Sequence, residues 1–334
     1  MIIVRQGYTY KARRDFVLGE ILHFPTRCLV NTTHMGLWAL GIGQIFRSDD
    51  DGDSWSDASG NLDMTGSAVA QGLAEVGLAL LLFIQYSEEV KVFRCDKPGS
   101  WFWSSTLPGS LNCQAVVVGD GTVVVAAEAR AVLAIRTSSD QGATWQTLTQ
   151  FPARGPLSFF DVSDSGEALA IFLLERESVA GVELYSQICL IRLPGGSVLD
   201  EIFVESNIRS GTRVGPRKWL LGSDGALLCL DAEASKVTVE RALCDPSASV
   251  SAMDFQKGVL LTVEESESSS GVHFALEDSR TGPLTFPIML SNPVWDAKIV
   301  RDGVVILTEQ GAFKCAIRDE SGFSWLAPTA AEPQ

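Results

Sequence analysis

Histidine is scarce in this sequence, and so are the motifs that bind metals and cofactors. The three histidines, His23, His34 and His273, form neither an HxH nor an HExxH pattern, so the sequence predicts no zinc site. It also contains no phosphate-binding glycine loop and no serine nucleophile elbow. We therefore expect no metal and no cofactor.

The cysteines lack a pairing pattern. There are seven of them, which is an odd number, and no CxxC pair occurs, so they match neither a disulfide scaffold nor a zinc ribbon. Buried free thiols, which behave as small hydrophobic side chains, are the expected state. That state suits a protein that folds in a reducing cytosol. The cysteines are Cys28, Cys95, Cys113, Cys189, Cys229, Cys244 and Cys315.

Long hydrophobic runs and excess positive charge are also missing. The longest apolar run, Val76 to Ile84, is far shorter than the roughly 20 residues that cross a bilayer, and a buried strand explains it better. A short apolar start followed by bases is the reverse of a signal peptide, so none is expected. The formal net charge of −15 repels phosphate groups, which argues against nucleic acid and anionic membranes as partners.

Short β-branched runs separated by tight turns dominate what is present. One region predicts four consecutive strands, and four antiparallel strands in about 40 residues make one blade of a β-propeller. The predicted strands are Gln114–Asp120, Thr122–Ala129, Ala131–Ser138 and Thr144–Phe151.

A pattern of eight residues, Ser-x-Asp-x-Gly-x-x-Trp, occurs twice and has weaker copies elsewhere. The full copies contain Ser48, Asp50, Gly52 and Trp55, and then Ser138, Asp140, Gly142 and Trp145. The weaker copies contain Asp96, Gly99 and Trp101, and then Glu320, Gly322 and Trp325. The spacing between copies is about 45 residues or a multiple of it. This spacing predicts three further hairpins between Trp145 and Trp325. Candidates are Leu193–Ser197, Asp231–Lys236 and Glu277–Gly282.

These observations predict an all-β fold, a seven-bladed β-propeller of four-stranded antiparallel blades. Residues 21–334 form the single propeller domain in this interpretation. Residues 1–20 are an additional segment that we expect to close the ring or to pack on its rim.

The repeated pattern resembles the Asp-box, also called the BNR repeat. The resemblance implies a turn between the third and fourth strands of a blade, in which Asp accepts backbone N–H bonds and Trp fills the seam between blades. Gly supplies a backbone angle that other residues resist. The residues of the repeat are therefore predicted to be structural. The acidic run Asp49–Asp53 does not match a calcium loop, because Gly60 stands where an EF-hand needs Glu.

Several relatives of this type are glycosidases, which makes an enzyme the alternative to weigh. A sialidase would imply an arginine triad, an early Arg-Ile-Pro, a Tyr/Glu nucleophile pair and an Asp acid. The sequence has no Arg-Ile-Pro, and its closest Tyr/Glu pair is Tyr185 with Glu183, which we interpret as an outer-strand pair facing water. We predict no catalytic residue and no enzyme, with a sialidase-like glycoside hydrolase as the alternative.

Two basic segments and one aromatic segment are candidate contact surfaces. Tyr10–Phe16 and Arg209–Trp219 could dock an acidic partner or be solvated edges. In Ser100–Ser105, strand alternation places Trp101 and Trp103 on one face, in the seam between blades, with Phe102 on the other face.

The sequence favours a non-enzymatic structural or interaction propeller. Much of the Asp-box family works outside cells, yet no export signal is expected here, and a bacteriophage virion reconciles the two. We therefore expect a component of a phage tail or tail tip, folded in the host cytoplasm, with other tail proteins as partners and possible contact with a host glycan or receptor. The alternatives are a stand-alone glycan- or receptor-binding propeller, the hydrolase, and an assembly factor.

Overall fold

A computed structural model describes most of the chain. The described residues are 2–5, 8–11, 26–65, 68–87, 89–107, 112–118, 121–129, 132–152, 155–163, 165–178, 181–193, 196–243, 245–256, 259–266, 272–278, 282–288, 294–301, 303–308 and 311–316. Every long regular element among them is a β-strand. None of them lies in a helix of the length and hydrophobicity that a membrane span requires.

The strands from residue 26 onward form consecutive antiparallel sheets, which we number 1 to 7 in chain order. Among the described residues six of these sheets have four strands and the last has three. Sheet 1 contains β3 (Thr26–Thr32), β4 (Gly36–Gly41), β5 (Ile45–Ser48) and β6 (Ser56–Asp57). Sheet 2 contains β7 (Val69–Val76), β8 (Ala79–Tyr86), β9 (Glu89–Lys97) and β10 (Ser100–Leu107). Sheet 3 contains β11 (Asn112–Val117), β12 (Val123–Ala129), β13 (Val132–Ser138) and β14 (Gln146–Pro152).

The remaining sheets follow the same order. Sheet 4 contains β15 (Leu157–Val162), β16 (Glu167–Ser178), β17 (Gly181–Arg192) and β18 (Ser197–Val204). Sheet 5 contains β19 (Ile208–Gly215), β20 (Lys218–Ser223), β21 (Ala226–Asp231) and β22 (Lys236–Ala242). Sheet 6 contains β23 (Ser249–Gln256), β24 (Val259–Glu265), β25 (Val272–Asp278) and β26 (Gly282–Ile288). Sheet 7 contains β27 (Val294–Val300), β28 (Gly303–Thr308) and β29 (Gly311–Ala316).

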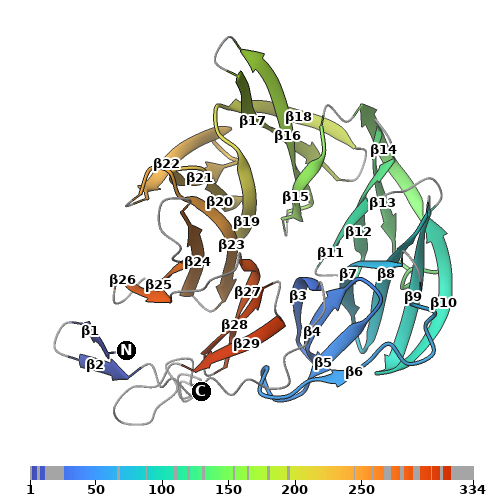
Figure 1. Cartoon of the computed structure of the whole chain (residues 1–334). Coiled ribbons are helices and arrows are strands. Elements are labelled where there is room, and N and C mark those ends of the chain that lie inside the picture. The colour runs from blue at the N-terminus through green and yellow to red at the C-terminus, as the bar shows by residue number, and fades with distance from the viewer. Residues whose placement is uncertain are drawn as a thin grey trace, which may run out of the picture.

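The first strand of each sheet lies near a common axis, and each contacts the first strand of the next sheet (Figure 1). The contacts run from β3 through β7, β11, β15, β19 and β23 to β27, which contacts β3 again. This is a β-propeller with four-stranded antiparallel blades, and the predicted fold class is confirmed at that level.

The predicted strands and hairpins agree closely with this arrangement. The four strands expected between residues 114 and 151 are β11 to β14. The three expected hairpins fall between third and fourth strands that pair with each other in sheets 4, 5 and 6, although residues 194–195 and 279–281 lie outside the described residues. The run Val76 to Ile84 is divided by a turn at Gly77, where φ is +63°, and β8 begins after it. Short β-branched runs bounded by turn residues were sufficient to place these strands.

The core lies between neighbouring sheets, so a central strand is buried on both faces. In β8, Leu80, Leu82 and Ile84 pack in the apolar cluster against sheet 1, whereas Leu81 and Phe83 pack in the cluster against sheet 3. All five side chains are fully buried. Successive side chains of a strand point to opposite faces, so one continuous apolar run packs against both neighbouring sheets.

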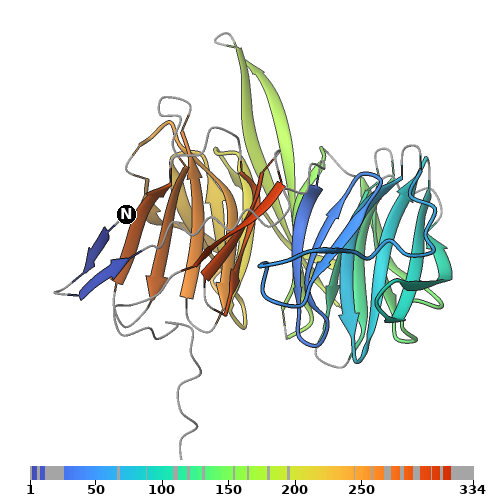
Figure 2. The same ribbon diagram turned by 60° about the horizontal axis from the view of Figure 1, so that its bottom comes forward.

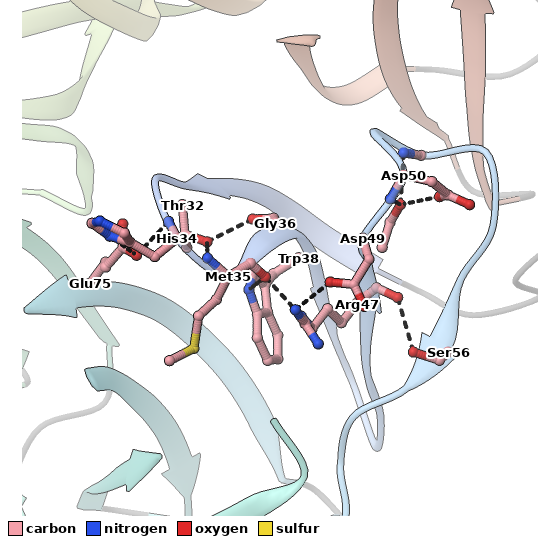
Figure 3. Close-up of polar contacts among 12 residues, drawn as sticks. Thr32, His34, Met35, Gly36, Trp38, Arg47, Asp49, Asp50, Ser56 and Glu75 are labelled. Carbon is pink, nitrogen blue, oxygen red and sulfur yellow. Dashed lines mark hydrogen bonds and ion pairs between the residues drawn. The ribbon is translucent and has the colours of Figure 1, made fainter. Parts of the chain in front are cut away.

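Carboxylates near the first strands join neighbouring sheets at several points. Glu75 of β7 accepts hydrogen bonds from the backbone of the β3–β4 turn, including His34 N at 2.8 Å (Figure 3). Asp161 of β15 accepts from Trp219 Nε1 at 2.7 Å, and Asp254 of β23 accepts from Ile299 N at 2.8 Å. Each bond satisfies a donor that the sheet itself leaves unpaired.

The junction of sheets 7 and 1 joins segments that are far apart in the sequence. Asp296 Oδ2 accepts a hydrogen bond from Leu29 N at 2.8 Å, and Asp296 Oδ1 lies 3.2 Å from Lys298 Nζ. Burial by itself would lower the pKa of Lys298, but Asp296 and Asp254 outweigh it and hold the pKa above its ordinary value. On the outer side, Lys314 Nζ lies 2.8 Å from Asp53 Oδ2.

Strands β1 (Ile2–Arg5) and β2 (Tyr8–Lys11) pair with each other in a separate two-stranded sheet. Residues 12–25 lie outside the described residues, as do Glu320, Gly322 and Trp325. The closing or packing role of residues 1–20 therefore stays a prediction.

Removing the carboxylate at the junction should destabilise the ring. Asp296→Ala leaves Leu29 N without its acceptor and removes a carboxylate that pairs with the buried charge of Lys298. We therefore expect the free energy of unfolding to fall by about 2–4 kcal/mol. Urea denaturation measures this change. The matched control is Asp96→Ala, whose exposed carboxylate pairs with Arg94 of the same strand and should cost at most about 0.5 kcal/mol. Equal losses for both variants would contradict the role of Asp296.

Candidate functional site

The first strands carry β-bulges at equivalent places. In six of sheets 1 to 7, one residue near the start of the first strand has no counterpart on the second strand. A bulge changes the direction in which a side chain points and is frequent beside functional sites. The bulged residues are Arg27, Gln71, Ser158, Arg209, Ser251 and Trp295.

A cavity of about 390 Å³ opens where these bulges meet, at the mouth of the central channel. All seven first strands contribute to its lining, and five of the six bulged residues take part. Its volume lies in the range of about 300–1,000 Å³ that is usual for ligand pockets. The lining includes Gln71, Gln114, Ser158, Phe159, Arg209, Ser251, Met253, Trp295, Asp296 and Lys298.

The charged side chains in this cavity are paired within the protein. Lys298 is paired with Asp296, as described above. The guanidinium of Arg209 lies 3.7 Å from Asp224. When the Asn207 amide is oriented to suit its neighbours, its oxygen accepts hydrogen bonds from Arg209 Nε at 2.8 Å and Nη2 at 3.0 Å. The cavity therefore presents balanced charge rather than a strong field of one sign.

Uncharged groups in the same cavity have spare hydrogen-bonding capacity. The hydroxyl of Ser251 is buried, and no described residue is its hydrogen-bond partner. Trp295 is 36% exposed, and the lining also includes Phe159 and Met253, although Met253 is only 5% exposed. The described residues therefore leave the hydrogen-bonding capacity of the Ser251 hydroxyl unused.

The β16–β17 hairpin projects from one face of the disc (Figure 2), and strand direction places the cavity on that same face. The first strand starts at this face, so the turn between the second and third strands lies on the same side. Leu157, at the start of β15, pairs with Phe172, and β16 continues beyond that level to Ser178. At about 3.3 Å per residue, the hairpin extends roughly 20 Å beyond the start of β15.

The two full copies of the repeated pattern fold into matching turns between third and fourth strands. Asp50 Oδ1 accepts hydrogen bonds from Ser48 Oγ and Ser54 N, each at 2.8 Å, and Gly52 N donates to Ser48 Oγ at 2.7 Å. Figure 3 shows Asp50 beside the Arg47–Asp49 ion pair, with Ser56 donating to Arg47 O. We call this the first repeat turn, residues 48–55.

The second repeat turn, residues 138–145, reproduces these bonds. Asp140 Oδ1 accepts from Ser138 Oγ at 2.8 Å and from Thr144 N at 2.9 Å, and Gly142 N donates to Ser138 Oγ at 2.8 Å. The φ angle is +92° at Gly52 and +80° at Gly142. Trp55 and Trp145 are half-buried, and Trp145 Nε1 donates to Ser105 Oγ of β10 at 2.9 Å. Both turns lie at the ends of third strands, on the face opposite the cavity.

The weaker copy in sheet 2 has a different turn. Asp96 forms its ion pair with Arg94, and Gly99, with φ of +78°, lies in the tight β9–β10 turn. Trp101 is 2% exposed and donates from Nε1 to Ala58 O at 2.8 Å. The expected burial of Trp103 beside Trp101 is wrong, because Trp103 is 64% exposed. β6 of the neighbouring sheet has two residues, so little of that sheet reaches the outer part of β10.

The other sequence candidates fall in structural positions. In the basic segment 209–219, Arg217 Nε lies 2.7 Å from Glu167 Oε2, and Arg213 Nε lies 3.9 Å from Asp161 Oδ2. These charges join sheets 4 and 5. Tyr185 lies in a third strand and packs partly into the cluster between sheets 3 and 4, so the expected outer-strand position is wrong. Tyr10–Phe16 extends outside the described residues.

No protein-family model matches the chain, and no curated protein matches it. Solved structures do show similar folds. YCF48 bound to D1 peptide has a TM-score of 0.65 at 14% identity, over 89% of this chain and 96% of that one. The Dos1 propeller has a TM-score of 0.60 at 10% identity, over 89% and 92%. The GH74 xyloglucanase from Xanthomonas campestris has a TM-score of 0.64 at 13% identity, over 97% of this chain and 55% of the enzyme. At such identities the likeness shows the β-propeller fold alone.

Glycine should be harder to replace in the second repeat turn than in the sheet 2 turn. Both positions have positive φ, so alanine should cost about 1 kcal/mol of unfolding free energy at either. A Cβ at Gly142 would also lie 2.9 Å from the buried Leu81 side chain, whereas a Cβ at Gly99 meets nothing within 4 Å. We expect Gly142→Ala to cost about 1 kcal/mol more than Gly99→Ala in urea denaturation. Equal costs would show that the repeat turn does not pack on sheet 2 as described.

The charge of Asp140 should contribute to stability in a defined pH window. Hydrogen bonds from the Thr144 side chain and backbone, and from Ser138, lower the pKa of Asp140 to about 2. Because the folded pKa is below the unfolded value of about 4, the contribution is complete above pH 4 or so and is lost as the pH falls toward 2. Thermal denaturation between pH 2 and pH 7 should show a weaker acid dependence for Asp140→Asn than for the wild type. Parallel curves would contradict this assignment.

Proposed function

We propose that this chain is a non-enzymatic interaction propeller that works in a larger protein assembly. The observation that carries the proposal is the cavity at the channel mouth, where bulged residues of separate sheets point into one space. Its described lining contains one carboxylate, Asp296, which is already bonded to Leu29 N and Lys298. Glycoside hydrolysis usually needs two carboxylates at the scissile bond, so this site is better suited to binding.

The finer architecture in this proposal is a seven-bladed ring of the Asp-box type. The ring of contacts between first strands, from β3 to β27 and back to β3, supports seven blades. The matching hydrogen bonds in the two repeat turns support membership of the Asp-box type. The structural likeness to YCF48, a propeller described as bound to D1 peptide, is consistent with peptide or protein binding.

The assembly we propose is a bacteriophage tail or tail tip, with neighbouring tail proteins as partners and possible contact with a host glycan or receptor. Among the described residues, Cys95, Cys113 and Cys229 are buried thiols outside any disulfide, as suits folding in a host cytoplasm. The net charge of −15 makes nucleic acid an unfavourable partner.

Density-gradient sedimentation of the native source, followed by peptide mass spectrometry of each fraction, tests this proposal. We expect peptides of this chain to travel with a particle of megadalton mass. Their ratio to other proteins gives the copy number. Migration as a free monomer would overturn the assembly role. Turnover of a fluorogenic sialoside or of xyloglucan would instead establish a hydrolase.

A further inference from the structure

We propose that the mouth of the central channel binds a segment of a partner polypeptide that is uncharged and carries a large apolar side chain. This inference rests on the proposed function and names the partner class and the face of the disc. The site consists of the bulged residues Ser251 and Trp295 together with Gln114, Phe159 and Met253.

The charge balance of the mouth determines that the segment is uncharged. Lys298 is neutralised by Asp296 at 3.2 Å, and Arg209 has both Asn207 and Asp224 beside it. An acidic ligand at Arg209 would meet Asp224, and a basic ligand at Asp296 would meet Lys298. A charged ligand would have to displace an existing partner, whereas a neutral one would not.

The free hydrogen-bonding groups are those that match a peptide backbone. In the described part of the chain, Ser251 Oγ is buried without a partner, and the side chains of Gln114 and Trp295 make no hydrogen bond. Together they offer a hydroxyl, a primary amide and an indole N–H. A peptide group has one donor and one acceptor, so this neutral set can satisfy it.

The apolar part of the mouth favours a large side chain on the bound segment. Trp295 is 36% exposed, and Phe159 and Met253 line the same cavity. An aromatic or branched aliphatic side chain that enters this space would cover the indole and remove apolar surface from water.

The projecting hairpin favours a polypeptide over a small free molecule. Residues 173–178 of β16 continue past Phe172, which pairs with Leu157 at the start of β15, and Leu184 of β17 is 44% exposed. The β16–β17 hairpin projects from one face of the disc (Figure 2). A segment that enters the mouth from that face would continue alongside the hairpin. A free sugar would fill the mouth and leave this neighbouring surface unused.

Selection from a displayed library of random 12-residue peptides against the full chain tests the inference. The selected sequences should be poor in charge and contain a large apolar residue. Fluorescence polarisation with labelled synthetic copies should show binding at least about 10-fold weaker for Trp295→Ala, as for an aromatic anchor. Ser251→Leu, which fills the cavity and leaves the indole in place, should also weaken binding about 10-fold or more. Trp103→Ala is the matched control, since it removes an exposed tryptophan from the rim, and it should leave binding unchanged.

Three results would contradict binding of an uncharged polypeptide segment at the mouth. Selection of strongly charged peptides, or loss of binding in Trp103→Ala with retention in Trp295→Ala, would overturn the inference. Failure to select any peptide, with saturable binding of neutral monosaccharides that Ser251→Leu abolishes, would assign the mouth to carbohydrate. Each of these outcomes leaves the sedimentation result untouched, so the channel inference can fail while the assembly role stands.

Discussion

The burial of each central strand on both of its faces is the constraint on which the rest of this structure depends. The alternating apolar side chains of β8 pack against sheet 1 on one face and sheet 3 on the other. Exposure of either face of a blade to solvent would therefore place apolar side chains in water. Each sheet is stable only between two neighbours. Closure of the ring follows from the same requirement, since an open ring would leave two apolar sheet faces in water.

Hydrogen bonds between neighbouring sheets add to the apolar packing. Glu75, Asp161, Asp254 and Asp296 each accept a hydrogen bond from an adjacent sheet, and the last of these bonds joins β27 to β3 across almost the whole sequence. These bonds are directional, whereas apolar packing is not. The first strands carry their bulges near the same end of each sheet.

The two faces of the disc differ in structure. The repeat turns lie at the ends of third strands and bond almost entirely within themselves and to the preceding sheet. The opposite face has the channel mouth, where Ser251 and Trp295 have capacity to spare, and the long hairpin of sheet 4. In the proposed function the face with the channel mouth binds the partner, as a rigid scaffold with variable loops permits.

The sequence by itself determined the four-stranded blades, the hairpins and the two repeat turns. Their causes are local, because β-branched runs, glycines with positive φ and the bonds of Asp140 act within a few residues. The tertiary structure alone decided the channel mouth, whose residues come from first strands between residues 28 and 298. No sequence pattern marks a bulge such as the one at Trp295. The tertiary structure also left Trp103 exposed, since burial in the seam depends on how far the neighbouring sheet extends and not on strand alternation.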